Sequence, residues 1–196
     1  MRRLLVLVAW LPLQALAGTQ VYEPLADSVR QRLSTQVADK AAPSLHFRSA
    51  EDGNRWLDTM ERRLAERMPD RKQRLELLRT VQYEATRAGL DPQLVLGVIE
   101  VESAFRKYAV SRAGARGYMQ VMPFWVKQIG RPQHNLFHMR TNLAYGCAIL
   151  RLYIDQENGD YFRALGRYNG SLGSSQYPRA VLKAWKITWK YSGPTA

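Results

Sequence analysis

The sequence predicts a mainly α-helical fold. Glycine and proline are sparse before residue 110, so few residues there would interrupt a helix. Apolar residues recur in that part at intervals of three and four positions, which is the spacing of one helical face. Strand signals are weak along the whole chain. The 196 residues are enough to bury one ordinary hydrophobic core.

The first seventeen residues have the pattern of a secretory signal peptide. A basic start, 1–3, precedes an apolar run, 4–16, and Ala15-Leu16-Ala17 has the small-x-small pattern of a signal-peptidase site. The run is too short to span a bilayer, and no later stretch is long and apolar enough. We expect residues 1–17 to be a signal peptide, the mature chain to be periplasmic, and no transmembrane segment in it. The alternative is an N-terminal core helix.

We expect residues 18–87 to form an N-terminal helical extension. Ser49 supplies a capping hydroxyl ahead of two acidic residues, and Gly89 is a typical stop after a helix. Pro43 and its small neighbours interrupt the helical pattern, so residues 41–44 are the expected linker. The expected helices of this part cover residues 23–39, 49–69 and 71–88.

Residues 88–196 are the second expected unit. Asp91 and Pro92 supply a helix cap followed by a first-turn proline. Residues 109–121 contain serine and glycines and are expected to be a loop or a short strand. Further helices are expected after Asp91 and over residues 142–153, 161–168 and 177–190.

The net charge of +12 is concentrated in the second half of the chain. Residues 103–196 carry 14 Lys and Arg against 3 Asp and Glu, whereas residues 1–102 are nearly balanced. Such a surface favours an anionic partner such as nucleic acid, an anionic membrane or a cell-wall polymer. The expected export argues against nucleic acid. A basic surface without a dedicated partner is the alternative. The single cysteine, Cys147, excludes an intrachain disulfide.

Glu102 is the leading candidate for a catalytic residue. Val95 and Val98 precede it by seven and four positions, so all three share one apolar helical face. Glu100 falls on the opposite face and is expected to be solvated. Burial favours the protonated form of a carboxyl group, as a general acid requires. The alternative is a structural glutamate paired with one of the arginines.

Several fragments in one order resemble the catalytic domain of soluble lytic transglycosylases. These enzymes are relatives of goose-type lysozyme that cleave the glycan strands of peptidoglycan. The resemblance covers roughly residues 88–186 and implies a lysozyme-like helical fold. Its fragments are Ile99-x-x-Glu102-Ser103, Ala109-Val110-Ser111-x-x-Gly114-Ala115-x-Gly117-x-Met119-Gln120-x-Met122-Pro123, Leu136-Phe137, Asn142-Leu143-x-x-Gly146-x-x-x-Leu150 and Ala164-x-x-x-Tyr168-Asn169-Gly170.

The resemblance implies roles for six positions. Glu102 would be the single catalytic acid and base, with Tyr168 placing its hydroxyl near it and Ser103 supporting the site by hydrogen bonding. Met119 and Gln120 would line the sugar-binding groove. The expected substrate-binding residues are therefore Ser103, Met119, Gln120, Tyr168 and Asn169. No cofactor and no metal is implied.

The distribution of acids agrees with a site that has one carboxylate. Glycosidases of the ordinary kind need a second carboxylate about 5–9.5 Å from the first. No Asp or Glu occurs from 103 to 154. The family instead uses the 6-hydroxyl of muramic acid, helped by its N-acetyl group, and forms a 1,6-anhydro end. The expected partner is the peptidoglycan glycan strand, with envelope machinery left open. A lysozyme-type hydrolase and a non-catalytic wall-binding or envelope-assembly module remain as alternatives.

Other sequence features point less clearly to chemistry. Tyr118 stands where the family usually has leucine, which we interpret as a core substitution. His134 and His138 have the spacing of a metal pair, but no acid or cysteine is near them in sequence. Cys147 is expected to be a small core residue. The aromatic and basic residues of 183–191 are expected to pack one face of a helix on the core.

Overall fold

The structure is a computed structural model that describes residues 20–193. The expected signal peptide, 1–17, lies outside these residues. Helices joined by irregular segments account for the described part, together with two isolated β-bridges, Val110–Arg116 and Arg116–Val121. This confirms the mainly α-helical prediction. The helices are α1 (Asp27–Val37), α2 (Ala50–Leu64), α3 (Arg71–Arg87), α4 (Pro92–Ser103), α5 (Phe124–Ile129), α6 (Met139–Gln156), α7 (Tyr161–Asn169), α8 (Gln176–Lys183) and the π-helix η1 (Ala184–Thr188).

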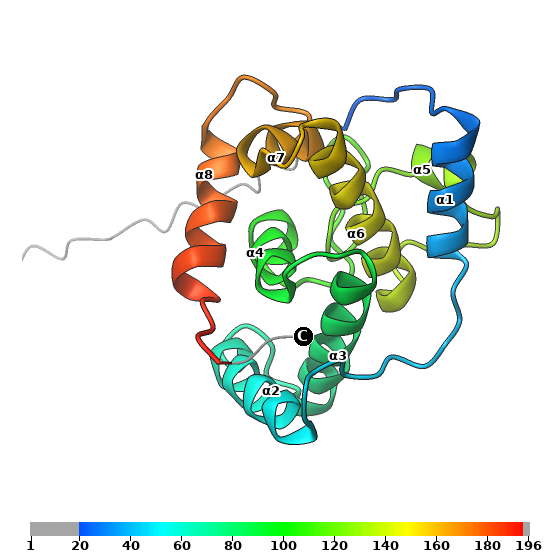
Figure 1. Cartoon of the computed structure of the whole chain (residues 1–196). Coiled ribbons are helices and arrows are strands. Elements are labelled where there is room, and N and C mark those ends of the chain that lie inside the picture. The colour runs from blue at the N-terminus through cyan, green and yellow to red at the C-terminus, as the bar shows by residue number, and fades with distance from the viewer. Residues whose placement is uncertain (1–19, 194–196) are drawn as a thin grey trace, which may run out of the picture.

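Helix α4 lies at the centre of the fold, inside a ring formed by the other long helices (Figure 1). It packs against α3, α8 and η1. Every residue from 93 to 99 is buried, because this helix is apolar on all sides. The last turn of α4 carries Glu102, so the sequence of this one helix brings a carboxyl group into the interior.

The local signals of the sequence set most helix ends correctly. The Ser49 hydroxyl accepts a hydrogen bond from the backbone N–H of Asp52 at 3.1 Å, and the Asp91 carboxylate accepts one from Gln93 at 2.8 Å. Gly89 follows α3 with φ 65°, in the left-handed region that favours glycine. Helix α1 is shorter than the expected 23–39 at both ends, because residues 20–26 and 38–47 are irregular. Helix α6 is longer than the expected 142–153, because it begins at Met139 and continues to Gln156.

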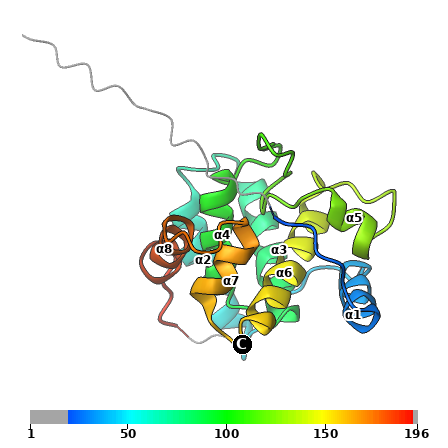
Figure 2. The same ribbon diagram turned by 90° about the horizontal axis from the view of Figure 1, so that it is seen from above.

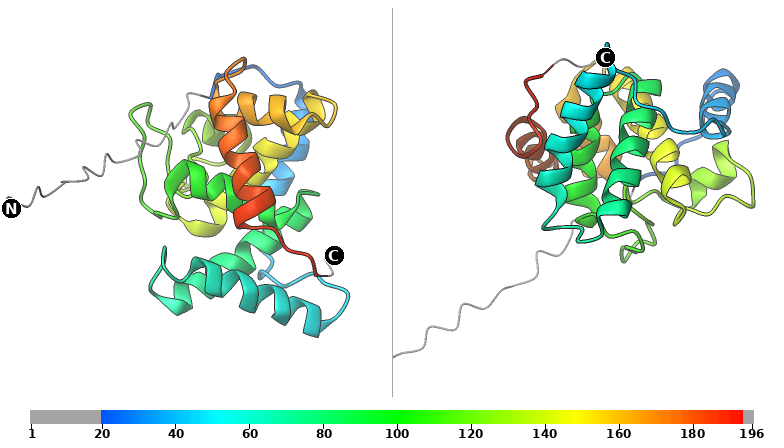
Figure 3. Two further views of the ribbon diagram at one scale, coloured as in Figure 1. Left: turned by 90° about the vertical axis from the view of Figure 1, so that its left-hand side faces the viewer. Right: turned by 90° about the horizontal axis from the view of Figure 1, so that it is seen from below.

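The extension has two separate parts. Helices α2 and α3 run side by side at one end of the molecule (Figure 3). Helix α1 lies on the other side, against α5 and α6 (Figure 2). One continuous cluster of buried apolar side chains joins residues of α1, α2 and α3 to those of α4, α6 and α7. The division at residue 88 stays a prediction.

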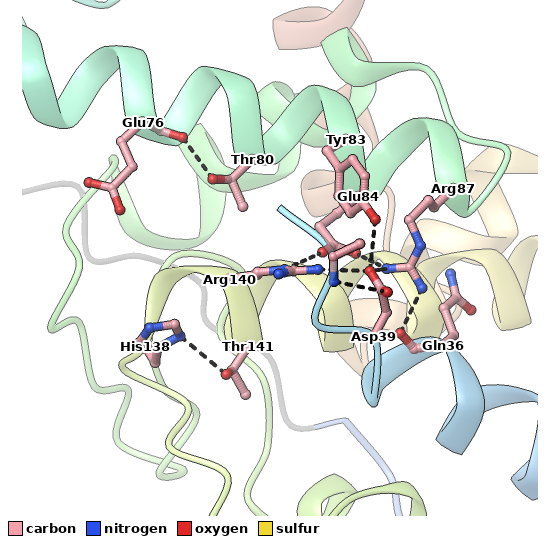
Figure 4. A network of polar contacts seen from close by, with 11 residues as sticks. Gln36, Asp39, Glu76, Thr80, Tyr83, Glu84, Arg87, His138, Arg140 and Thr141 are labelled. Carbon is pink, nitrogen blue, oxygen red and sulfur yellow. Dashed lines mark hydrogen bonds and ion pairs between the residues drawn. The ribbon is translucent and has the colours of Figure 1, made fainter. Parts of the chain in front are cut away.

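A partly buried ionic network fixes the connection between α1 and α2 (Figure 4). Asp39 accepts hydrogen bonds from Tyr83 on α3 at 2.8 Å and from Arg140 on α6 at 2.7 Å. Glu84, whose side chain is 1% exposed, pairs with Arg87 and Arg140 at 2.8 and 3.3 Å. Because each charge meets an opposite one, the partly buried network can hold Glu84 in the interior and the first turn of α6 against α3.

The C-terminal aromatic residues pack inward, as expected. Trp189 is fully buried and its indole N–H donates to Glu100 at 2.6 Å. Trp185 is half-buried and donates to Asp91 at 2.8 Å. None of the helices among residues 20–193 combines the length and apolar character needed to cross a membrane.

Candidate active site

Glu102 lies in the last turn of α4, with its side chain inside the protein. The residue is 3% exposed. Ala104 and Phe105 follow with φ 48° and 62°, so the chain turns away sharply directly after the helix. The hydroxyl of Tyr177, from α8, donates a 2.7 Å hydrogen bond to Glu102 Oε1. The carboxyl group is therefore held from the opposite side by a second helix.

Burial dominates the electrostatics of Glu102. It raises the pKa of this carboxyl to about 8, because a charged carboxylate is poorly solvated in the interior. Hydrogen bonds from the side chains of Tyr177 and Asn169 stabilise the ionised form and lower the pKa in part. At neutral pH Glu102 is mostly protonated, which is the state of a general acid.

Glu100, two residues earlier, is not solvated as expected. Its carboxylate accepts hydrogen bonds from Arg67 at 2.7 Å and from Trp189 at 2.6 Å. The two bonds tie α4 to Arg67, after α2, and to Trp189, after η1, so Glu100 is a structural anchor. Within residues 20–193, no other carboxylate contributes to the pKa of Glu102. The site described here thus has one carboxyl group.

The acids after residue 154 have structural roles. Asp155 pairs with Arg151 at 2.7 Å, and Glu157 pairs with Arg163 and Arg167. Asp160 caps α7 by accepting from the backbone N–H of Arg163 at 3.0 Å. As expected, these acids belong to a helix end and a loop.

Asn142, fully buried on α6, fixes the loop of residues 116–120. Its side chain accepts from the backbone N–H of Met119 at 2.8 Å and donates to the carbonyls of Arg116 and Leu136, both at 2.8 Å. Gly117 has φ 75°, and a Cβ there would lie 2.5 Å from the Asn142 amide nitrogen. The tight turn expected at Gly117 is present, and its close neighbour is Asn142.

Met119 and Gln120 turn their side chains into the protein. Met119 is fully buried and packs on Gly146 of α6, where a Cβ would lie 2.3 Å from the Met119 sulfur. Gln120 is 4% exposed, and its amide donates to the carbonyls of Ala109 and Gly117 at 3.1 and 2.9 Å. Both side chains brace the loop. Their contact with a glycan strand stays a prediction.

Tyr168 lies close enough to Glu102 for the glutamate charge to help raise the pKa of its phenol, but the structure gives no hydrogen bond between the two side chains. The roles expected for Tyr168 and Ser103 stay predictions. The Tyr168 hydroxyl donates to the carbonyl of Met119 at 2.7 Å, so it ties α7 to the loop. The Ser103 hydroxyl bonds back to the carbonyl of Ile99 within α4 at 3.1 Å. The hydroxyl in direct contact with Glu102 comes from Tyr177. Sequence reasoning missed Tyr177 because it lies 75 positions away and belongs to none of the quoted motifs.

The remaining candidates lie apart from Glu102 in the hydrogen-bond network. His134 contacts the Tyr145 hydroxyl at 2.8 Å, and His138 contacts Thr141 at 3.3 Å. Cys147 is free and buried, and burial raises the pKa of its thiol. Among residues 20–193 no three potential metal-ligating side chains come together.

Fold and site together define a helical protein that buries one glutamic acid at the end of its central helix, in contact with a tyrosine from α8 and an asparagine from α7. The family model of the Transglycosylase SLT domain matches residues 79–184, which is more than half of the chain. The chain belongs to this family.

Similar proteins carry transglycosylase names. A transglycosylase of Enterobacteria phage PRD1 is 32% identical over 127 residues, which cover 61% of this chain and 47% of that protein. The membrane-bound lytic murein transglycosylase C of Actinobacillus pleuropneumoniae is 54% identical over 48 residues, covering 24% and 13%. The chain thus spans less than half the length of these two relatives.

A solved structure supports the fold. An inactive mutant of the lytic transglycosylase Slt from Pseudomonas aeruginosa superposes with a TM-score of 0.51 at 19% identity. The match covers 88% of this chain and 38% of that one. The likeness therefore extends through most of the N-terminal extension as well as the family domain.

Proposed function

We propose that the protein is a peptidoglycan lytic transglycosylase. It cleaves the β-1,4 bond between N-acetylmuramic acid and N-acetylglucosamine and leaves a 1,6-anhydro-muramic acid end. Membership of the Transglycosylase SLT family supports the reaction class, and the murein transglycosylase names of relatives support the substrate. If residues 1–17 are a signal peptide, the enzyme acts in the periplasm.

The observation that carries the proposal is the single protonated carboxyl of Glu102. With a pKa of about 8 it holds a proton at neutral pH and can transfer it to the glycosidic oxygen as the bond breaks. The resulting carboxylate then takes the proton of the muramic acid 6-hydroxyl, whose oxygen attacks the anomeric carbon. One residue serves as acid and then as base, so no second carboxylate is required.

The surrounding contacts suit both halves of this cycle. The Tyr177 hydroxyl donates to Glu102 Oε1, and the Asn169 amide adds a second hydrogen bond. Both bonds stabilise the carboxylate that exists between the two proton transfers, while burial favours the acid before and after it. A lysozyme-type hydrolase needs a water held by a facing carboxylate or an equivalent group, and the described residues place no carboxylate there.

Mass analysis of the products tests the proposal. Purified mature protein is incubated with peptidoglycan sacculi, and the soluble muropeptides are compared with those from the Glu102→Gln variant. The expected result is anhydro-muropeptides from the native protein and none from the variant, which keeps its helical circular dichroism spectrum.

Two other outcomes would contradict the proposal. Muropeptides with ordinary reducing ends would identify a hydrolase. Absence of any product, together with co-sedimentation of both proteins with sacculi, would identify a non-catalytic wall-binding module.

A further inference from the structure

A large cavity lies between the first half of α3 and the start of α6. Its volume is about 970 Å³. Figure 4 shows Glu76 and Thr80 of α3 on one side and His138 and Arg140 of α6 on the other. Lys107 and Tyr108, from the loop that follows α4, form a further wall. The cavity is separate from the buried carboxyl of Glu102, which does not line it.

The lining of this cavity is strongly basic. Five cationic side chains meet a single acid, Glu76, and the cations are Arg71, Lys72, Arg79, Lys107 and Arg140. Among the described residues Lys72, Arg79 and Lys107 form no ion pair. Arg140 differs, because Asp39 and Glu84 hold it in the ionic network. Three uncompensated cations around one hollow favour a ligand with several negative charges.

The inner surface of the cavity is less polar than its rim. Met139 is 7% exposed and Thr80 is 3% exposed, and the half-buried Leu75 lies beside them. The free cations Lys72 and Arg79 are exposed at the edge. A ligand that fits must therefore offer apolar groups to the inner surface and anionic groups to the rim. A short peptide with carboxylate side chains has this chemistry.

The cavity borders the chain segment that leaves the catalytic helix. A second, open hollow of about 390 Å³ is lined by residues 106–110 and shares Lys107 and Tyr108 with the first. These two residues follow Glu102 by five and six positions. Tyr108 is 70% exposed, and the Lys107 ammonium lies 5.3 Å from its ring centroid. Lys107 and Tyr108 thus line both hollows and belong to the segment that directly follows the helix carrying Glu102.

We propose that this cavity binds the carboxylate-bearing stem peptide that muramic acid carries in peptidoglycan. The inference rests on the proposed function. Lys72, Arg79 and Lys107 would pair with the peptide carboxylates, and Leu75 would contact the methyl groups. Glu76, as the one acid of the cavity, would pair with the amino group of a diamino acid in the stem. The cavity would then recognise strands that carry peptides and engage naked glycan weakly.

Isothermal titration calorimetry of the full mature chain tests the binding step. The probe is the tripeptide N-acetyl-L-alanyl-γ-D-glutamyl-meso-diaminopimelate, whose blocked N-terminus leaves one amino group, and the Glu102→Gln background prevents turnover. We expect the added pair Arg79→Gln and Lys107→Gln to weaken binding at least about tenfold, since each removes a charge-assisted contact. The pair Arg179→Gln and Lys183→Gln makes the same charge change at two exposed positions of α8 and should leave the affinity unchanged.

The Glu76→Gln variant separates specific recognition from general attraction. It should weaken binding of the tripeptide and leave unaltered the affinity for a tripeptide in which the amino group of the diamino acid is acetylated as well. The proposal would be overturned if the Arg79→Gln/Lys107→Gln and Arg179→Gln/Lys183→Gln double variants bound the tripeptide with equal affinity. A second result would also overturn it. The native protein would bind a short oligonucleotide but not the tripeptide, and Arg79→Gln with Lys107→Gln would abolish the oligonucleotide binding. The cavity would then be a site for another polyanion.

Cleavage rates distinguish failure of this inference from failure of the proposed function. In the active enzyme, Arg79→Gln with Lys107→Gln should raise KM several-fold on intact sacculi and leave it unchanged on glycan strands stripped of peptide by an amidase. An enzyme that cleaves both substrates with unchanged KM would refute the peptide site alone. An enzyme that cleaves neither would refute the catalytic proposal, while the calorimetry would still decide on the peptide.

Discussion

The hydroxyl of Tyr177 donates a 2.7 Å hydrogen bond to Oε1 of Glu102, and both residues are buried. The bond joins the last turn of α4 to the first turn of α8, which pack against each other. It lowers the pKa of a carboxyl that burial has raised, so it sets how strongly Glu102 holds its proton.

Replacing Tyr177 with phenylalanine should slow cleavage without unfolding the protein. Loss of the hydrogen bond leaves the carboxylate less stabilised, so the pKa of Glu102 rises and the side chain is less well oriented. We expect kcat to fall by about 10- to 100-fold, within the range that general acid–base groups contribute. The alkaline limb of the pH–rate profile should move to higher pH.

Tyr168→Phe is the matched control. In the native protein the hydroxyl of Tyr168 donates to the carbonyl of Met119 and not to the carboxyl of Glu102. This variant should lose stability and leave the alkaline limb in place. A pH–rate profile in which Tyr177→Phe and Tyr168→Phe behave alike would show that Tyr177 has no specific influence on the acid.

The rate of cleavage should depend on pH through the protonation of Glu102. The general acid is active when protonated, and its pKa of about 8 lies well above the ordinary value for glutamate of 4.5. We expect kcat/KM to fall tenfold per pH unit once the pH passes about 8, which rate measurements on sacculi at pH 4 to 10 would detect. A rate that declines already between pH 4 and 6 would mean that Glu102 is ionised at neutral pH.

The same pKa predicts a stability gain in Glu102→Gln. Between pH 4.5 and about 8 the unfolded chain has lost the proton that the folded chain keeps, so the folded state binds more protons and the free energy of unfolding falls as pH rises. A glutamine at position 102 does not titrate, so the variant does not lose this stability as the pH rises. Relative to the native chain, the variant should gain little at pH 4 and about 4 kcal/mol at pH 8, since each unit of pKa difference corresponds to about 1.4 kcal/mol.

Denaturant unfolding at several pH values measures this difference. Glu66→Gln makes the same chemical change at an exposed acid on the irregular segment after α2 and is the matched control. If the difference between Glu102→Gln and the native chain does not vary with pH, the carboxyl is not held protonated by burial.

Asn142→Ala should destabilise the protein strongly. It removes three hydrogen bonds and leaves the buried N–H of Met119 and the carbonyls of Arg116 and Leu136 without their partner. Unsatisfied buried groups cost about 1–3 kcal/mol each, so a loss of about 3 kcal/mol or more is expected by denaturant unfolding. The exposed Asn135→Ala loses one local turn contact, and a comparable loss there would argue against the special role of Asn142.

Some features of the site could be read directly from local sequence. The apolar run of α4 with the cap at Asp91 determines a buried helix, and the spacing from Val95 and Val98 determines that Glu102 points inward. These are short-range effects of helical periodicity and capping, so they do not depend on the rest of the fold. The same reasoning was wrong for Glu100, whose partners Arg67 and Trp189 come from distant segments.

The sequence by itself determined the helical class, most helix ends, the acid at the end of α4 and the family resemblance of the second half. Only the tertiary structure decided which hydroxyl contacts that acid. Tyr168 and Tyr177 are both buried, and the packing of α7 against the loop and of α8 against α4 assigns one to Met119 and the other to Glu102. The tertiary structure also placed the cations of α3 and α6 around one cavity. Such partners are set by contacts between helices far apart in the chain, which local periodicity does not encode.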